Sequence, residues 1–214
     1  KLPSGIRLGE FTGGDRRWFR ERLGIREEED VLLYVGRVGR EKNLLFLLDA
    51  YREIVNAWPK ARLVLVGGGP ELPTIRSVAE EWGLGDRVIL AGPVAPADVK
   101  HCYAGADVFV FPSLTETQGL VIVEAKAAGL PAVAVRAFGV TEMIADGADG
   151  FLVDLDREVF AKRVLCLLGD PALRHKMAQN ARKNALNFSA ERMARELMRC
   201  YETLIENKKS GKLA

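Results

Sequence analysis

Two glutamates, Glu116 and Glu124, stand eight positions apart across the point where a polar loop runs into a predicted helix. The loop follows a run of large apolar residues, and the helix is expected at 120–128. Its first backbone N–H groups lack intrahelical partners and attract phosphate, whereas a carboxylate one turn later suits neutral hydroxyls. The pattern predicts a site for a ligand with both phosphate and sugar, lined by the amides of Gln118, Gly119 and Leu120.

A simpler interpretation also fits these two glutamates. In it, Glu116 is a solvated surface acid and Glu124 is a first-turn charge that interacts favourably with the helix dipole. The choice between the two depends on what the neighbouring loops carry.

The segment 36–43 follows an earlier apolar run and carries two cations, Arg37 and Lys42. Its first residue, Gly36, lets backbone approach a ligand, and two cations at a strand-to-helix turn suit a diphosphate. The spacing is not a dinucleotide fingerprint, because the third glycine of that pattern is missing. A solvated basic loop is the alternative.

Other polar residues point to chemistry less directly. The run Gly67-Gly68-Gly69-Pro70 permits close ligand approach but is also typical of any tight turn. Glu142 is either a ligand-side acid or a helix cap, and His101 and His175 are expected to be structural or surface residues. No cluster has metal-ligand spacing, so neither a metal nor a resident cofactor is predicted.

Composition restricts the function classes. The 214 residues include 31 Lys or Arg and 29 Asp or Glu, so bulk attraction to nucleic acid or an anionic membrane is not expected. Three widely spaced cysteines fit neither a disulfide framework nor a metal knuckle and suit a reducing compartment. No run is apolar enough to span a membrane. Because the chain opens without Met and with turn residues, we expect it to be a fragment of a longer protein.

Short apolar runs, each ended by Gly or Pro, alternate with amphipathic segments of helical length. They predict an α/β fold: a Rossmann-like parallel sheet of about six strands with helices on both faces. Ligands bind beyond the carboxyl ends of such strands, so the loops above are expected at one edge. Strands are expected at 31–35, 62–66, 88–90, 108–111, 132–135 and 151–153.

The helical segments follow the same rhythm until residue 171, after which the pattern is purely helical. We divide the chain into an interdomain linker at 1–28, a Rossmann-like binding domain at 29–170 and C-terminal helices at 171–214. Ser189 is predicted to cap the last helix, and the tail 208–214 to be frayed. Helices are expected at 15–23, 43–56, 72–82, 97–104, 120–128, 157–168, 173–186 and 190–207.

Taken together, the loops resemble the carboxyl-terminal, donor-binding domain of the retaining glycosyltransferases of family four, which have the GT-B fold. The spacing of Glu116 and Glu124 matches the most specific motif of that family. The resemblance covers nearly the whole chain through co-linear matches at 2–6, 36–43, 64–70, 88–92, 106–108 and 150–153.

The resemblance implies that Arg37 and Lys42 hold the diphosphate of a nucleotide sugar, with UDP favoured. Glu116 would contact the sugar, together with the amides of Gly119 and Leu120, and Gly36 and Gln118 would complete the donor contacts. Glu124 would bind the ribose, and the backbone near Pro93 and Val94 would meet the base. Glu116, Arg37 and Lys42 would be the catalytic residues.

Three positions depart from the family pattern. Arg7 stands where an acid is usual, Phe138 replaces the first of two glycines, and Thr117-Gln118 replaces the commoner Gly-Phe. The segment 115–120 resembles a subgroup that includes lipid-glucosylating enzymes, which suggests a lipid acceptor.

The resemblance further implies transfer of a hexose to an acceptor hydroxyl with retention, driven by electrostatic stabilisation of the departing diphosphate. In such enzymes the other Rossmann domain supplies most acceptor contacts, so this chain alone is expected to bind a donor without transferring its sugar. The helix from Ala190 resembles one that packs toward that missing N-terminal domain. The full enzyme is expected in the cytoplasm, peripheral to the inner face of the membrane.

Two other functions fit the same residues. A sugar-nucleotide epimerase of GT-B architecture would use the same phosphate and ribose contacts, and a non-catalytic nucleotide-binding module would use them without chemistry.

Overall fold

The computed structural model describes residues 4–210, which fold around a six-stranded sheet. The strand order is β3-β2-β1-β4-β5-β6, and every pairing is parallel. The predicted fold class is therefore confirmed, and each strand begins and ends within two residues of its predicted bounds. The strands are β1 (Asp30–Val35), β2 (Ala61–Val66), β3 (Val88–Gly92), β4 (Val108–Phe111), β5 (Ala132–Val135) and β6 (Gly150–Val153).

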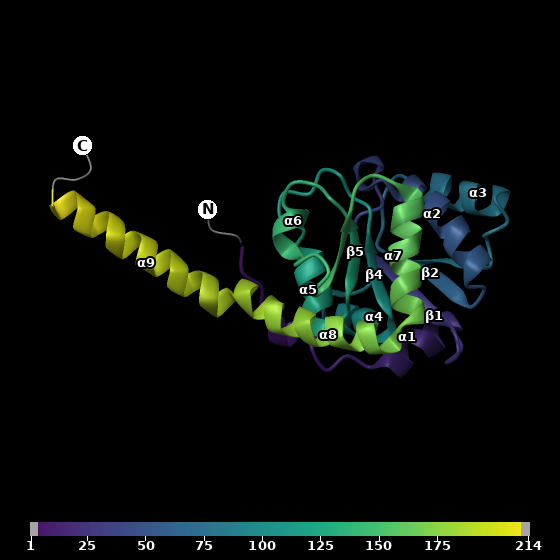
Figure 1. Cartoon of the computed structure of the whole chain (residues 1–214), viewed down its shortest axis with the longest axis horizontal. Helices are drawn as coiled ribbons and strands as arrows, with labels where there is room; N and C mark the ends of the chain where they lie inside the picture. The colour runs from purple at the N-terminus through teal and green to yellow at the C-terminus, as the bar shows by residue number, and fades with distance from the viewer. Residues whose placement is uncertain (1–3, 211–214) are drawn as a thin grey trace.

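Helices cover both faces of this sheet (Figure 1). On one face α2 contacts α3 and α7, and on the other α4 contacts α1 and α5. Strands buried on both sides need continuous apolar sequences, which explains the runs in β1, β4 and β5. The helices are α1 (Arg16–Leu23), α2 (Leu44–Ala57), α3 (Leu72–Glu81), α4 (Val99–Gly105), α5 (Leu120–Ala128), α6 (Val140–Met143), α7 (Arg157–Gly169), α8 (Pro171–Ala185) and α9 (Ala190–Lys209).

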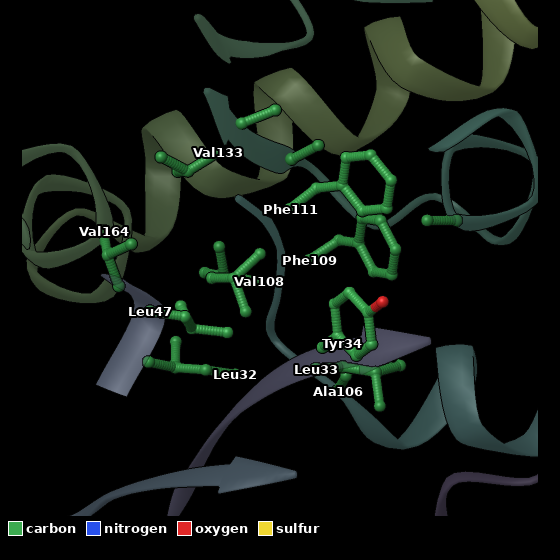
Figure 2. Packing of buried hydrophobic residues seen from close by; sticks show 14 of the residues in the cluster. Leu32, Leu33, Tyr34, Leu47, Ala106, Val108, Phe109, Phe111, Val133 and Val164 are labelled. Atoms are coloured by element: carbon green, nitrogen blue, oxygen red, sulfur yellow. The ribbon is translucent and has the colours of Figure 1, made fainter. Parts of the chain in front are cut away.

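Three aromatic rings pack among aliphatic side chains in the core (Figure 2). Tyr34 and Phe111 stack with ring centroids 6.1 Å apart, and Phe109 and Phe111 stack at 6.0 Å. All three rings are buried, and each aromatic ring removes a large apolar area from water. Because Tyr34 and Phe111 lie near the ends of β1 and β4, their stacking fixes where the two following loops begin.

Buried charges tie α1 to the sheet. Arg20 is fully buried, donates to the carbonyl of Gly105 at 3.0 Å and pairs with Asp107 at 2.9 Å. Asp107 also accepts a hydrogen bond from the Val31 amide at 2.8 Å, at the start of β1. The ring of His101 accepts a hydrogen bond from the backbone amide of Asp15, just before α1, at 2.8 Å, which is a structural role of the kind expected of this histidine.

The last two helices differ from the prediction at their ends. α8 begins at Pro171, two residues early, because proline fits a first helical turn and Asp170 accepts a hydrogen bond from the amide of Leu173. α9 is capped by Ser189 as predicted, but it continues to Lys209, so residues 208 and 209 are helical rather than frayed. Ser210 is the residue that ends α9, and residues 211–214 of the predicted tail lie outside the described residues.

Backbone hydrogen bonds connect the first residue of α9 and the segment before it to Ile6. The amide of Ile6 donates to the carbonyl of Phe188 at 3.0 Å, and the amide of Ala190 donates back to Ile6 at 2.9 Å. Beyond this junction α9 has no buried residue and extends away from the body of the molecule (Figure 1). Leu2 and Pro3, part of the motif at 2–6, lie outside the described residues. Within residues 4–210, no helix has the length and apolar character that crossing a membrane requires.

Candidate functional site

The carboxyl ends of β1 and β4 lie side by side at the centre of the sheet. Leu32 pairs with Val108 and Leu33 with Phe109. From this pair the strand order continues in opposite directions, through β2 to β3 and through β5 to β6. Open α/β sheets bind ligands at such a switch point. The loops that follow β1 and β4 therefore form the candidate site.

Lys42 and Glu116 join these two loops through an ion pair. The Lys42 Nζ lies 2.6 Å from one carboxylate oxygen of Glu116 and 3.1 Å from the other. The two side chains are mostly buried, with exposed fractions of 17% and 19%. The structure thus brings together a cation and a carboxylate that the sequence analysis placed on separate loops.

Asn43 also joins the loops, although it was absent from the predicted contacts. It precedes α2 with a left-handed backbone, φ 56°, and its side-chain amide donates to the carbonyl of Pro112 at 3.3 Å. The predicted helix began at 43 and treated this residue as helical. The available signal was the asparagine itself, since Asn enters the left-handed region more readily than most residues with a side chain.

Gly67 allows the loops after β1 and β2 to touch. A Cβ atom at this position would stand 1.8 Å from the carbonyl oxygen of Gly36. Any side chain would therefore push the two loops apart. This contact holds the backbone of Gly36, at the start of the β1 loop, against the loop that follows β2.

Arg37 is placed differently from Lys42. Its side chain is 68% exposed, and its guanidinium lies 3.9 Å from the carboxylate of Glu41. Its carbonyl accepts a hydrogen bond from the Tyr34 hydroxyl at 2.8 Å. Burial raises the pKa of Tyr34, and the charges of Glu116 and Glu41 raise it further. Each predicted cation is thus already matched by a carboxylate of the protein.

The amino end of α5 has no side-chain cap. Gly119 occupies the cap position with φ 65°, a conformation that favours glycine, and supplies no oxygen to the helix amides. The first amides, beginning with Leu120, therefore face the loop without a side-chain partner. Gln118 is half-buried just before this turn. The Gly139 amide donates to the carbonyl of Glu116 at 3.2 Å and holds the loop against α6.

Glu124 lies one turn into α5 and is held by α4. The hydroxyl of Tyr103 donates to its carboxylate at 2.7 Å. Burial raises the pKa of Glu124, and this hydrogen bond lowers it in part. Sequence reasoning missed Tyr103, because no local pattern connects residues that lie 21 positions apart on different helices.

Pro93 and Val94 lie apart from this group. They follow β3, which β2 separates from β1. Pro93 is exposed and Val94 is half-buried. The structure therefore places the predicted base contacts at the outer end of the same sheet edge.

Phe138 is the departure from the family pattern that stands out in the structure, with 82% of its surface exposed in the turn before α6. Its carbonyl accepts a hydrogen bond from the Thr141 hydroxyl at 2.7 Å, so the turn itself is fixed. Glu142 lies in the first turn of α6. Among the residues described, no group of three or more His, Cys, Asp or Glu side chains is arranged to hold a metal ion.

Comparison with protein families identifies the family of this chain. The sequence model described as glycosyl transferases group 1 matches residues 15–184. The chain belongs to this family. The match includes both loops of the candidate site and ends before α9, so the resemblance inferred from the loops is confirmed for the family.

Individual relatives agree with this assignment. The chain is 34% identical over 95% of its length to D-inositol 3-phosphate glycosyltransferase of Segniliparus rotundus, and covers 46% of that protein. It is 32% identical over 99% of its length to alpha-monoglucosyldiacylglycerol synthase of Acholeplasma laidlawii, and covers 54% of that protein. The chain thus spans about half the length of these curated relatives.

The fold itself matches a solved structure. The Anabaena HepE protein in complex with UDP superposes with a TM-score of 0.86 over 94% of this chain and 57% of that one, at 24% identity. The GT-B half-domain architecture is therefore confirmed.

Proposed function

We propose that this chain is the donor-binding half of a retaining glycosyltransferase that transfers a hexose from a nucleotide sugar to an acceptor hydroxyl. The observation that carries the proposal is the Lys42–Glu116 pair beside the uncapped start of α5, at the switch point of a glycosyl transferases group 1 chain. A cation and helix amides suit a diphosphate, and a carboxylate suits sugar hydroxyls.

Each residue has a role in this proposal. Lys42 and Arg37 stabilise the charge that builds on the departing diphosphate, together with the α5 amides, and no proton transfer by these cations is needed. Glu116 binds the sugar and Glu124 the ribose. Gly36 and Gln118 add contacts at the loops, and the backbone at 93–94 meets the base.

The other half of the enzyme supplies the acceptor site in this proposal. The curated relatives are about twice as long as the matched region, and α9 presents unburied apolar side chains that another domain can cover. They are Leu197, Met198, Tyr201, Leu204 and Ile205. The chain alone then binds a donor without transferring its sugar.

We further propose a lipid as the acceptor, with the enzyme working in the cytoplasm at the inner membrane surface. The similarity to alpha-monoglucosyldiacylglycerol synthase and the segment 115–120 support this choice. The inositol phosphate named for the other relative is the competing acceptor class.

Calorimetry on this chain tests the donor site directly. UDP comes first in a panel with GDP and ADP, because the similarly folded HepE was crystallised with UDP. We expect one of the three to bind. With the matching sugar nucleotide, we expect this chain alone to transfer no sugar. Absence of heat and of any thermal shift with all three would contradict the proposal. Product analysis on the full-length protein then separates transfer from epimerisation and from binding alone.

A further inference from the structure

The ion pair between Lys42 and Glu116 joins two residues that the proposed function assigns to different parts of one ligand. Lys42 is assigned to the diphosphate and Glu116 to the sugar. The ammonium of Lys42 contacts both carboxylate oxygens of Glu116, at 2.6 and 3.1 Å. An incoming diphosphate therefore meets a cation that a carboxylate already neutralises.

The surrounding charges do not relieve this competition. Arg37 is directed toward Glu41 at 3.9 Å, so the second cation also has a carboxylate nearby. Both of these carboxylates lie close enough to Tyr34 to raise the pKa of its hydroxyl, after the larger effect of burial. A bare diphosphate thus enters a site whose cations are paired and which also contains negative charge.

The backbone around the pair is fixed, so a change of partner needs only side-chain rotation. The carbonyl of Glu116 accepts the Gly139 amide at 3.2 Å, and the Lys42 amide donates to the carbonyl of Gly39 at 3.0 Å. The side-chain amide of Asn43, next to Lys42, donates to the carbonyl of Pro112, just after β4, at 3.3 Å. The two charged groups can therefore separate without movement of either loop.

We propose that Glu116 sets the preference of the site for a sugar-linked diphosphate over a bare nucleoside diphosphate. This inference rests on the proposed function and deepens it. When the sugar is present, its hydroxyls donate to Glu116 and release Lys42 to the diphosphate. When the sugar has left, Glu116 returns to Lys42 and competes with the product. Specificity here comes from an internal competitor as well as from favourable contacts.

Binding of the bare diphosphate is the decisive measurement. An isolated loop carboxylate would leave that affinity almost unchanged when it is removed. The ion pair predicts the opposite: Glu116→Gln should bind the active member of the UDP, GDP and ADP panel about three- to tenfold more tightly than the wild type. The same variant should gain nothing for the matching sugar nucleotide, so the preference between the two ligands falls.

Two further variants show whether Lys42 carries the effect. Glu71→Gln removes one negative charge from the same sheet edge, after β2, and leaves the pair intact, so its diphosphate affinity should stay within about twofold of the wild type. In a Lys42→Met background, Glu116→Gln relieves only the direct repulsion between carboxylate and diphosphate, so it should tighten the diphosphate by a smaller factor than it does with Lys42 present. Thermal unfolding of each variant confirms that it is folded.

The outcomes separate this inference from the proposed function. If a diphosphate binds the wild type but Glu116→Gln binds it equally or more weakly, the inference is wrong and the donor site stands. The inference is also wrong if Glu116→Gln tightens binding equally without Lys42. If no diphosphate binds any variant, the proposed function itself is overturned, and this inference with it.

Discussion

At the scale of single residues, Glu124 combines two opposing demands. Burial raises the pKa of its carboxyl, so the ionised form destabilises the fold, and stability falls as the pH rises through that raised value. Glu124→Gln keeps an oxygen for Tyr103 and removes the charge. We expect it to raise the free energy of unfolding by about 0.5–2 kcal/mol at pH 8, and by less at pH 4, in urea denaturation.

Ligand binding should respond in the opposite direction. Under the proposed function, Glu124→Gln weakens the nucleoside diphosphate because a ribose hydroxyl loses a charged acceptor. Tyr103→Phe is the matched control: it leaves the carboxylate in place and removes its hydrogen bond of 2.7 Å, so it should lower stability. A less stable Glu124→Gln at pH 8 would show that the carboxylate has favourable partners beyond Tyr103.

The two cations of the first loop should contribute unequally to binding. Lys42 is mostly buried and Arg37 is 68% exposed, so water screens Arg37 more strongly. Lys42→Ala should weaken nucleoside diphosphate binding by about 1.5–3 kcal/mol, Arg37→Ala by less, and both should leave the bare nucleoside unaffected. Arg40→Ala, an exposed cation of the same loop, serves as the control in calorimetry. Equal losses for nucleoside and diphosphate would contradict a role through charge.

At the scale of the elements, most of the sheet could be predicted from sequence because each strand leaves a strong local pattern. Val108–Phe111 is a continuous apolar run ended by Pro112, and both features depend only on neighbouring residues. The expectation that the ligand-binding loops lie at one edge of the sheet follows from the parallel direction of the strands alone. Helix starts were less accurate where capping decides them, as at Asn43 and Pro171.

The contacts between elements could not be predicted in the same way. The ion pair between Lys42 and Glu116 depends on β1 lying next to β4 in the sheet. That strand order follows from how the helices pack, and the local sequence of neither strand specifies it. The bond between Tyr103 and Glu124 likewise depends on α4 and α5 sharing a face. Such pairings reflect tertiary packing, which periodicity does not record.

A buried ion pair connects α5 to the segment before β6. Lys126 on α5 and Asp149 before β6 are both fully buried, with Nζ and carboxylate 2.8 Å apart. Asp149 also accepts a hydrogen bond from Asn184 on α8 at 2.6 Å. Burial lowers the pKa of Lys126, and Asp149 raises it in part. The pair therefore joins α5, which begins at the site, to α8 beneath it.

Breaking only one side of this pair should be costly. Asp149→Ala leaves the ammonium of Lys126 buried without its carboxylate, and we expect a loss of about 3–5 kcal/mol in chemical denaturation. Lys126→Met combined with Asp149→Ala should recover part of that loss, because no uncompensated charge remains. Strictly additive effects of the two substitutions would exclude the coupling.

At the scale of the whole molecule, the chain consists of a packed α/β body and a helix that contributes little to it. The family match ends at residue 184, and α9 has no buried residue. Leu197, Tyr201, Leu204 and Ile205 recur at helical spacing on α9 and are about half exposed. An amphipathic helix without a partner is stabilised by tertiary packing only when something covers its apolar face.

Truncation tests this division of the molecule. A chain ending after Arg195 keeps the bonds between Ile6 and the root of α9 but loses the apolar face. Because no buried side chain is removed, we expect the free energy of unfolding to change by less than about 0.5 kcal/mol in urea denaturation. Self-association measured by sedimentation should decrease, since exposed apolar surface is lost.

A second truncation, ending after Asp170, is the contrasting case. It removes α8, whose Met177, Ala181 and Ala185 are buried, together with the hydrogen bond from Asn184 to Asp149. The truncation also exposes the surfaces of α5 and α7 that α8 covers. Each large apolar side chain exposed to water there costs about 1.5–3 kcal/mol, so this chain should be severely destabilised. The contrary result is a truncation after Arg195 that lowers the free energy of unfolding as much as the truncation after Asp170 does. That result would mean that α9 packs on the α/β body, so that its apolar face is not free to contact another domain.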